Sequence, residues 1–217
     1  KAAEKALEVM TKNFGNPSSL HSLGFEAEQI IKGAKKNLSS ALGCKEGEVF
    51  FTSGGTEANN IAILGTAQAN IRRGNKIVVS AVEHSSVLEA AESLAQSGFE
   101  VIKIYPEKDG SISPQKVADA VDDKTILVSL MLSNNELGTI YDVATAGAGA
   151  RRKNPKVILH CVAVGAFGKI PVHTGRLGVD LLTVSAHKIH APKGVGALYI
   201  RKGVKIDNLL HGGAQER

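Results

Sequence analysis

The sequence predicts an α/β protein with a seven-stranded, mainly parallel sheet and helices on both faces. Two observations lead to this fold class. Short runs rich in β-branched residues recur along the 217 residues, and most are continuously apolar, as in strands buried on both faces. Helical patterns separate most of these runs, and crossover helices cover both faces of a parallel sheet. The predicted strands are 49–52, 76–80, 101–105, 125–130, 156–160, 181–185 and 196–200.

Helices are predicted from apolar spacing and from their end signals. The chain starts with a polar–apolar helical pattern over 1–10 instead of a signal peptide. Apolar spacing predicts a helix over 25–42, and Gly43 follows it as a C-cap. Ser113 before Pro114 is typical of an N-cap and first helical residue. The remaining predicted helices are 56–72, 85–96 and 114–121.

The segment 144–150 departs from this pattern, because it contains only alanine, threonine and glycine. Gly147 and Gly149 each cost about 1 kcal/mol relative to alanine in a helix. No large apolar side chain is present to anchor the segment. We therefore expect its helix to be weakly packed or frayed.

Composition excludes several classes of protein. With 43% hydrophobic and 22% charged residues, the chain is neither disordered, collagenous nor a coiled coil. No apolar run reaches the roughly 18 residues of a membrane span, so no membrane partner is expected. Two cysteines, Cys44 and Cys161, are too few for a disulfide framework and indicate a reducing, cytoplasmic location. The net charge of +5 is scattered and aromatics make up only 4%, so nucleic acid is not expected as a partner. No linker or domain boundary interrupts residues 1–217.

Polar residues follow the predicted strands, where ligands bind in open α/β sheets. Gly54, Gly55 and Thr56 combine glycines with a hydroxyl at a helix start, which suits a phosphate group. His84 follows the second strand and is suited to stacking or proton transfer. Asn135 lies in a polar loop after the fourth strand. Taken singly, these residues fit a tight turn, a surface histidine and a loop equally well.

The sixth strand is followed by the densest cluster of polar side chains. Ser185 and His187 offer phosphate ligands, and the amine of Lys188 could form a Schiff base. An exposed loop lysine is the ordinary alternative. A metal site at His187 and His190 is disfavoured, because no third ligand follows with standard spacing. Together, the strand ends indicate a pyridoxal-phosphate site with no metal.

At this level of detail the chain resembles the cysteine desulfurases, a group of fold-type-I pyridoxal-phosphate enzymes that includes the selenocysteine lyases. The resemblance runs nearly end to end. It rests on the motifs at 14–19, 51–60, 83–84, 134–138, 185–189 and 212–217. It implies that residues 1–217 form the cofactor-binding large domain, without the family's N-terminal segment and C-terminal small domain, and that the last strand is antiparallel.

The resemblance also implies roles for individual residues. Lys188 would form the Schiff base with pyridoxal phosphate, and His84 would stack on the ring and move protons. The phosphate would be held by Gly55, Thr56, Ser185 and His187. Asn135 would lie near the cofactor oxygen or the substrate carboxylate. The implied reaction removes sulfur from L-cysteine and leaves alanine. A homodimer would carry the sulfur as a persulfide and deliver it to an acceptor protein for iron–sulfur clusters and thio-cofactors.

Three positions depart from the family pattern. Val162 and Gly165 stand where the family has the Asp that pairs with the pyridine nitrogen and the Gln that contacts the ring oxygen. Ala191 replaces a family glycine, and alanine is costly if φ is positive there.

Neither Cys44 nor Cys161 occupies the persulfide position, so we read both cysteines as structural and expect impaired or incomplete turnover by this chain. The alternatives are a non-catalytic scaffold of the same fold, and another fold-type-I lyase or aminotransferase. An anion-binding module is supported only by the net charge.

Overall fold

A computed structural model of the chain describes residues 1–213, so positions 214–217 of the last motif lie outside the described residues. Seven strands form one sheet in the order β1-β7-β6-β5-β4-β2-β3. Strand β7 is antiparallel to both of its neighbours, and the other pairs are parallel. The predicted fold class and the antiparallel last strand are confirmed. The strands are β1 Val49–Thr52, β2 Lys76–Ser80, β3 Glu100–Ile104, β4 Thr125–Met131, β5 Ile158–Val162, β6 Leu181–Ser185 and β7 Gly196–Ile200.

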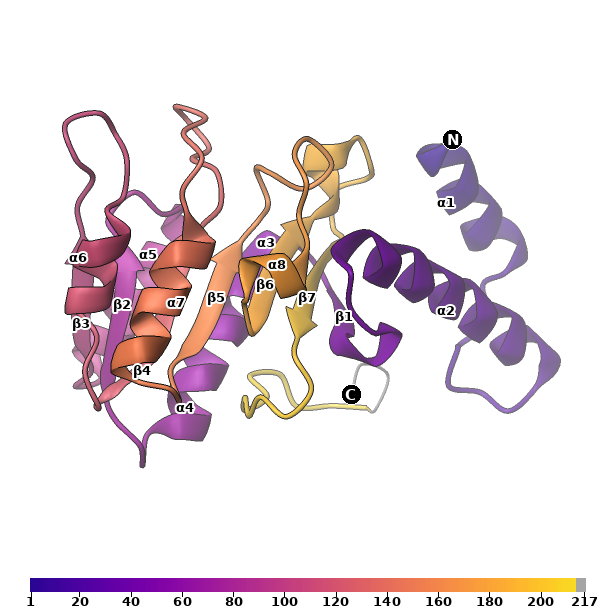
Figure 1. The fold of residues 1–217 in the computed structure, drawn as a ribbon. Coiled ribbons are helices and arrows are strands. Elements are labelled where there is room, and N and C mark those ends of the chain that lie inside the picture. Colours follow the sequence, from indigo (N-terminus) through magenta and orange to yellow (C-terminus); the bar gives the residue numbers. More distant parts are fainter. Residues whose placement is uncertain (214–217) are drawn as a thin grey trace.

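Helices cover both faces of the sheet. Figure 1 shows α6, α7 and α8 in front of it and α3, α4 and α5 behind it. Strands β2, β4, β5 and β6 are buried along their whole length, which is why their sequences are continuously apolar. The helices are α1 Ala2–Lys12, α2 Ser22–Leu42, α3 Gly55–Asn60, α4 Thr66–Asn70, α5 Ser85–Gln96, α6 Pro114–Asp119, α7 Val143–Lys153 and α8 Thr174–Leu177.

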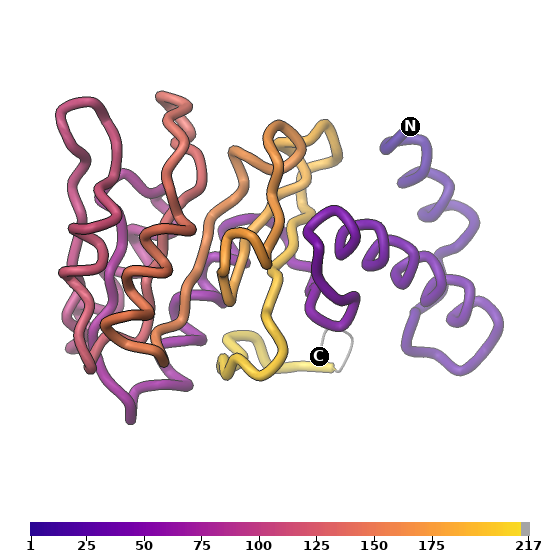
Figure 2. Tube along the Cα trace, in the orientation of Figure 1, coloured from indigo at the N-terminus to yellow at the C-terminus, as the bar shows by residue number. Residues whose placement is uncertain are grey.

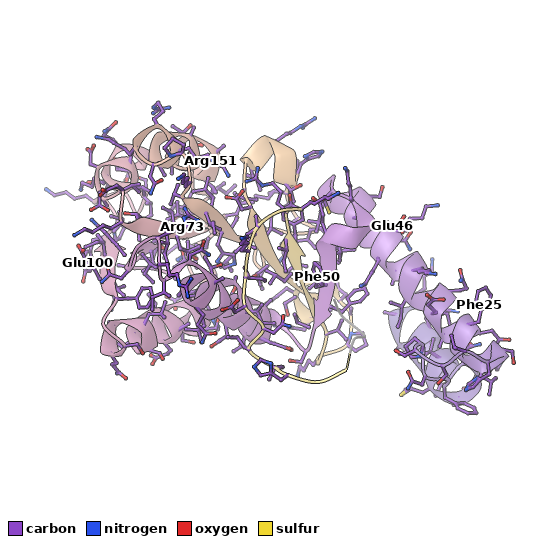
Figure 3. The ribbon with its side chains drawn as sticks, turned by 90° about the horizontal axis from the view of Figure 1, so that it is seen from below. Phe25, Glu46, Phe50, Arg73, Glu100 and Arg151 are labelled. Atoms are coloured by element: carbon purple, nitrogen blue, oxygen red, sulfur yellow. The ribbon has the colours of Figure 1, made fainter. Side chains whose placement is uncertain are left out.

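Helix α2 begins three residues before the predicted start, and its ends are capped by side chain and backbone. The His21 ring accepts a hydrogen bond from the Gly24 amide at 3.2 Å. Gly43 ends the helix with φ 67°, the left-handed conformation that glycine adopts without strain. Helices α1 and α2 extend away from the sheet, as the trace in Figure 2 makes clear. Helix α1 has no buried residue, and Phe25 of α2, labelled in Figure 3, is 61% exposed.

The predicted helix over 56–72 is divided into three consecutive parts. Between α3 and α4 lies η2 (Ile61–Gly65), which has the wider π-helical hydrogen bonding. Gly65, at its end, lies against the backbone of Asp207 and accepts a hydrogen bond from the Asp207 amide at 3.0 Å. The helical axis therefore continues over residues 55–70 and ends two residues early.

Helix α7 contradicts the expectation of a weak or frayed helix over 144–150. It spans eleven residues, and both glycines are buried. A Cβ on Gly147 would lie 2.7 Å from Leu159 Cδ1, and one on Gly149 would lie 2.9 Å from the Ala118 Cβ of α6. The glycines therefore allow close packing, which offsets their poor helix propensity. Arg151 (Figure 3) also anchors α7, because its guanidinium donates to buried Asp180 at 2.8 Å.

Strand β5 begins two residues later than predicted, because residues 154–157 form a turn. The Val157 amide donates to the Asn154 carbonyl at 3.1 Å, and the Lys156 amide donates to Asn154 Oδ1 at 3.0 Å. The strand also ends two residues later than predicted, at Val162, so Val162 lies inside the strand instead of after it. Strand β3 is likewise displaced by one residue and α6 ends at Asp119.

Candidate active site

A cavity of about 580 Å³ lies beyond the carboxyl ends of the parallel strands. Loops following β2, β4, β5 and β6, together with the start of α3, form its walls. It brings together residues that are more than 130 positions apart in the chain. Every residue that the sequence predicts for the cofactor site lines this one cavity: Gly55, Thr56, His84, Asn135, Ser185, His187 and Lys188.

The turn after β1 presents Gly55 and Thr56 to the cavity. Both the amide and the hydroxyl of Ser53 donate to the Glu57 carboxylate at 2.6 Å, which fixes the turn before α3. Gly196 of β7 crosses directly against the backbone of Gly54, where a Cβ would lie 2.6 Å from the Gly54 carbonyl carbon. This close approach requires glycine at 196 and places the first helical residues at the cavity wall.

The segment after β6 carries the predicted lysine. Residues Ala186–Ile189 form a single 3-10 turn, η3, which places His187 and Lys188 at the cavity. The Ser185 hydroxyl and His187 Nδ1 are 2.8 Å apart and hydrogen-bonded. The left-handed residue of this turn is His190, with φ 64°, so φ is not positive at Ala191 and alanine carries no such cost there. The strain falls one residue earlier, where η3 ends.

The end of β2 holds a buried acid next to His84. Glu83 is 5% exposed, and its Oε1 accepts hydrogen bonds from the Ser80 hydroxyl and the Met131 amide, both at 2.6 Å. Burial raises the pKa of Glu83 to about 7, and these two hydrogen bonds, which lower it, do not outweigh burial. Glu83 therefore ties the end of β2 to the end of β4, directly beside His84.

Asn134 organises the loop that presents Asn135. Its side-chain oxygen accepts hydrogen bonds from the Glu136 and Leu137 amides at 3.0 and 2.9 Å. Its side-chain amide donates to the Val82 carbonyl at 3.3 Å. Asn134 is buried and structural, whereas Asn135 is exposed at the cavity wall.

Strand β5 forms an apolar part of the wall. Val162 is 4% exposed and lines the cavity together with Gly165. A Cβ on Gly165 would lie 3.2 Å from the Ser133 carbonyl oxygen, so a larger residue would need that loop to move slightly. His160 is fully buried between Ser129 Oγ at 2.8 Å and Thr183 Oγ1 at 3.0 Å. Burial lowers the pKa of His160 to about 3, so this ring is neutral and structural.

The sequence interpretation missed Asn59, Ser86 and Lys169, which also line the cavity. Asn59 donates to Ser86 Oγ at 2.8 Å, and Ser86 contacts His84. The Lys169 amine donates to the Gly165 carbonyl at 2.9 Å. The available signals were an asparagine one turn into the helix after the glycines and a serine two residues after His84.

Both cysteines are poor nucleophiles in this structure. Burial raises the pKa of the Cys44 thiol to about 11. Cys161 is completely buried in β5, and burial raises the pKa of its thiol further. Since the thiolate is the reactive form, the structural reading of both residues agrees with their surroundings.

The described part of the chain contains no candidate metal site and no candidate membrane span. No group of three or more His, Cys, Asp and Glu side chains in residues 1–213 is arranged to hold a metal ion. No helix in this range is long and apolar enough to cross a membrane.

The cavity residues fit the phosphate and the aldehyde of pyridoxal phosphate, but they do not fit its ring nitrogen. Thr56, Ser185 and His187 supply hydrogen-bonding groups suited to a phosphate, and Gly55 leaves room, since a Cβ there would lie 3.3 Å from Val164 Cγ2. Lys188 supplies an amine in the same cavity for the cofactor aldehyde. Where a carboxylate would face the ring nitrogen, the cavity wall is the apolar side chain of Val162.

Comparison with known proteins agrees with this geometry. Residues 1–217 match the family described as Aminotransferase class-V. The cysteine desulfurase IscS of Methanosarcina thermophila is 48% identical over 214 residues, which are 99% of this chain and 52% of that protein. A solved NifS-like protein superposes with a TM-score of 0.97 at 38% identity, covering 100% of this chain and 59% of that one. A structure described as SspA in complex with cysteine gives 0.94 at 33% identity, covering 99% of this chain and 62% of the other.

The chain spans about half the length of the curated relatives it matches. The match nevertheless extends over all 217 residues, and the fold agrees with solved members over the whole chain. The chain therefore belongs to the aminotransferase class-V family, in which pyridoxal phosphate is the cofactor, and it is similar along its whole length to the cysteine desulfurases of that family.

Proposed function

We propose that residues 1–217 are the pyridoxal-phosphate-binding large domain of a cysteine desulfurase. The observation that carries the proposal is the single cavity in which Lys188, His84 and the phosphate-binding groups meet. The proposed whole-protein reaction breaks the carbon–sulfur bond of L-cysteine, leaves alanine, and passes the sulfur to an acceptor protein for iron–sulfur cluster and thio-cofactor synthesis. Relatives named as cysteine desulfurases support this substrate class.

Each cavity residue has a proposed task. Thr56, Ser185 and His187 bind the phosphate, and the helical run that starts at Gly55 directs backbone amides toward it. When bound, pyridoxal phosphate supplies an aldehyde that reacts with amines and a ring that accepts electrons. The Lys188 amine holds the cofactor. In the sequence, Lys188 directly follows the phosphate ligands Ser185 and His187.

The opposite side of the cavity orients the ring and the substrate. His84 presents its imidazole as a flat surface against the ring. Asn135 offers an amide to the substrate carboxylate or to the ring oxygen. Neither residue needs a metal ion for these contacts.

A second candidate function is a non-catalytic relative that keeps the fold as a scaffold. Val162 and Gly165 favour it, because neither can supply the charge or the hydrogen bond expected at those positions. If each lost contact is worth about 2–4 kcal/mol in the transition state, turnover falls by orders of magnitude. The scaffold would retain the packing of the sheet without the reaction.

Cofactor binding distinguishes the two candidates. The purified chain is mixed with pyridoxal phosphate, and its visible absorption is recorded before and after borohydride reduction. We expect a protein-bound, reducible band that Lys188→Ala abolishes. Lys169→Ala is the matched control, because Lys169 lines the same cavity but donates its amine to the Gly165 carbonyl. No band in the folded chain, or equal loss in both variants, would refute the assignment of Lys188 and leave the scaffold as the better reading.

We further propose that the protein works as a homodimer in the cytoplasm. Helices α1 and α2 and the loop between them carry apolar side chains that this chain leaves in solvent, including Met10 of α1 at 68%, Phe14 of the loop at 70% and Phe25 of α2 at 61% exposure. Covering them with a second copy would remove this surface from water. Sedimentation of the chain is expected to give twice the mass of one copy, and Phe25→Asp is expected to give a single copy.

A further inference from the structure

The His84 ring is fixed by a hydrogen-bond chain that starts on a different helix. His84 is the N-cap residue of α5, and its Nδ1 accepts from the Ser86 amide at 3.1 Å. The Ser86 hydroxyl lies 2.9 Å from the same nitrogen. On the other side, Asn59 of α3 donates its side-chain amide to Ser86 Oγ at 2.8 Å. Ser86 and Asn59 are 8% and 2% exposed, so water competes little for these contacts.

The direction of each hydrogen bond follows from donor chemistry. A backbone amide can only donate, so His84 Nδ1 must be the acceptor, and the proton of the neutral ring lies on Nε2. The Ser86 oxygen already accepts from Asn59, which leaves its own hydrogen free to donate to Nδ1. The chain therefore runs from the Asn59 amide through the Ser86 hydroxyl to His84.

We infer that Asn59 and Ser86 are positioning residues that hold His84 as the neutral Nε2–H tautomer in the cavity. Two donors converge on Nδ1, so a proton on that nitrogen would face the Ser86 amide hydrogen. The ring nitrogen left for contacts in the cavity is then Nε2, which carries a hydrogen. His84 thus offers a flat face and one donor, suited to an acceptor oxygen or sulfur on a bound molecule.

This inference deepens the proposed function. Only the identity of the molecule that faces His84 Nε2 rests on the proposed function. The tautomer itself is a property of the chain without cofactor. It bears on the expectation that His84 moves protons, because the acceptor nitrogen of the ring, Nδ1, already accepts from Ser86.

Asn59 has a second feature that bears on the direction of the chain. Its Oδ1 is buried and has no hydrogen-bond partner among the described residues. The reversed amide would direct Oδ1 at Ser86, and the Ser86 hydroxyl would then donate to Asn59 instead of to His84. A carboxylate at position 59 imposes that reversed direction, because it can only accept.

The test is nitrogen NMR of the ¹⁵N-labelled chain without cofactor, with His84→Gln to assign the ring signals. The folded chain is expected to show a protonated Nε2 and an acceptor Nδ1. Loss of the Ser86 hydroxyl in Ser86→Ala is expected to increase the Nδ1–H population about 3- to 10-fold, the equivalent of one ordinary hydrogen bond. Ser86→Thr keeps a hydroxyl and is expected to restore the wild-type ratio. Asn59→Asp is expected to shift the ratio in the same direction as Ser86→Ala.

Ser85→Ala is the matched control, because Ser85 is the exposed neighbour at the start of the same helix. A majority of Nδ1–H in the wild-type chain would overturn the inference without any variant, so it stays testable even if a variant fails to fold. Equal ratios of Nδ1–H to Nε2–H in Ser86→Ala and Ser85→Ala would show that the Ser86 hydroxyl does not hold the His84 tautomer. An unchanged ratio in Asn59→Asp would show that Asn59 does not contribute to it. Since no cofactor is present, a failure to bind pyridoxal phosphate would refute the proposed function and leave this result unaffected.

Discussion

Changing Glu83 to glutamine is expected to make the chain more stable at alkaline pH than at acidic pH, relative to wild type. Burial raises the pKa of the Glu83 carboxyl from 4.5 to about 7. Between these values the unfolded chain has released the proton, whereas the folded chain still holds it. Folding therefore takes up a proton in this window, and the Glu83 contribution to stability declines as pH rises.

The size of the effect follows from the width of that window. Each pH unit between 4.5 and 7 costs the native state about 1.4 kcal/mol, so the full window is worth about 3.5 kcal/mol. The ionised form is disfavoured in the folded chain because the side chain is 5% exposed and Oε2 has no hydrogen-bond partner among the described residues. Glutamine keeps an oxygen acceptor for Ser80 and Met131 but does not ionise.

Urea unfolding at pH 5, 6, 7 and 8 measures the prediction, with the free energy extrapolated to water at each pH. Other titrating groups are common to both proteins, so the difference between wild type and Glu83→Gln isolates residue 83. We expect this difference to move by about 2.5 kcal/mol in favour of the variant from pH 5 to pH 8, with most of the change below pH 7. A difference that stays constant from pH 5 to pH 8 would show that the buried carboxyl ionises like an exposed one, and the reasoning would fail.

Two further predictions concern the packing of α7 and the apolar cavity wall. Gly149→Ala is expected to lower the free energy of unfolding by about 1–2 kcal/mol, because overpacking against Ala118 outweighs the gain in helix propensity. The control is Gly33→Ala in α2, where nothing lies within 4 Å of the new Cβ, and its free energy of unfolding is expected to rise by up to about 1 kcal/mol. An equal rise for both variants in urea unfolding would contradict the packing argument. Val162→Asp is expected to destabilise the cofactor-free chain by about 3 kcal/mol through an unpaired buried carboxylate. Pyridoxal phosphate should then raise the melting temperature more in this variant than in wild type, and equal shifts in a thermal melt would show that residue 162 does not face the ring nitrogen.

Much of the fold is encoded in local patterns. Short apolar runs located all seven strands. Most of these runs are continuous, as in β2, β4, β5 and β6, because a strand that is buried on both faces has no solvent-facing position for a polar residue. Gly43 and the Ser113–Pro114 pair located helix ends, since capping depends on a few neighbouring residues. The polar residues at strand ends also predicted one shared cavity, because parallel strands bring their carboxyl ends to the same edge.

Local patterns failed where distant packing decides the outcome. The glycines of α7 weaken an isolated helix but allow it to approach α6 and Leu159 closely, and only the assembled structure contains those neighbours. The start of β5 was misplaced because Asn154 captures the two following amides in a turn, against the strand propensity of Val157.

The sequence by itself determined the fold class, the family resemblance and the residues of the candidate cofactor site, because these depend on residue type and spacing along the chain. Only the tertiary structure decided which groups are paired and which are neutral. Asn59 reaches Ser86 across 27 positions, and Glu83 reaches the Met131 amide across 48. Hydrogen bonds and burial at such separations arise when helices and strands pack, and they set the tautomer of His84 and the ionisation of Glu83.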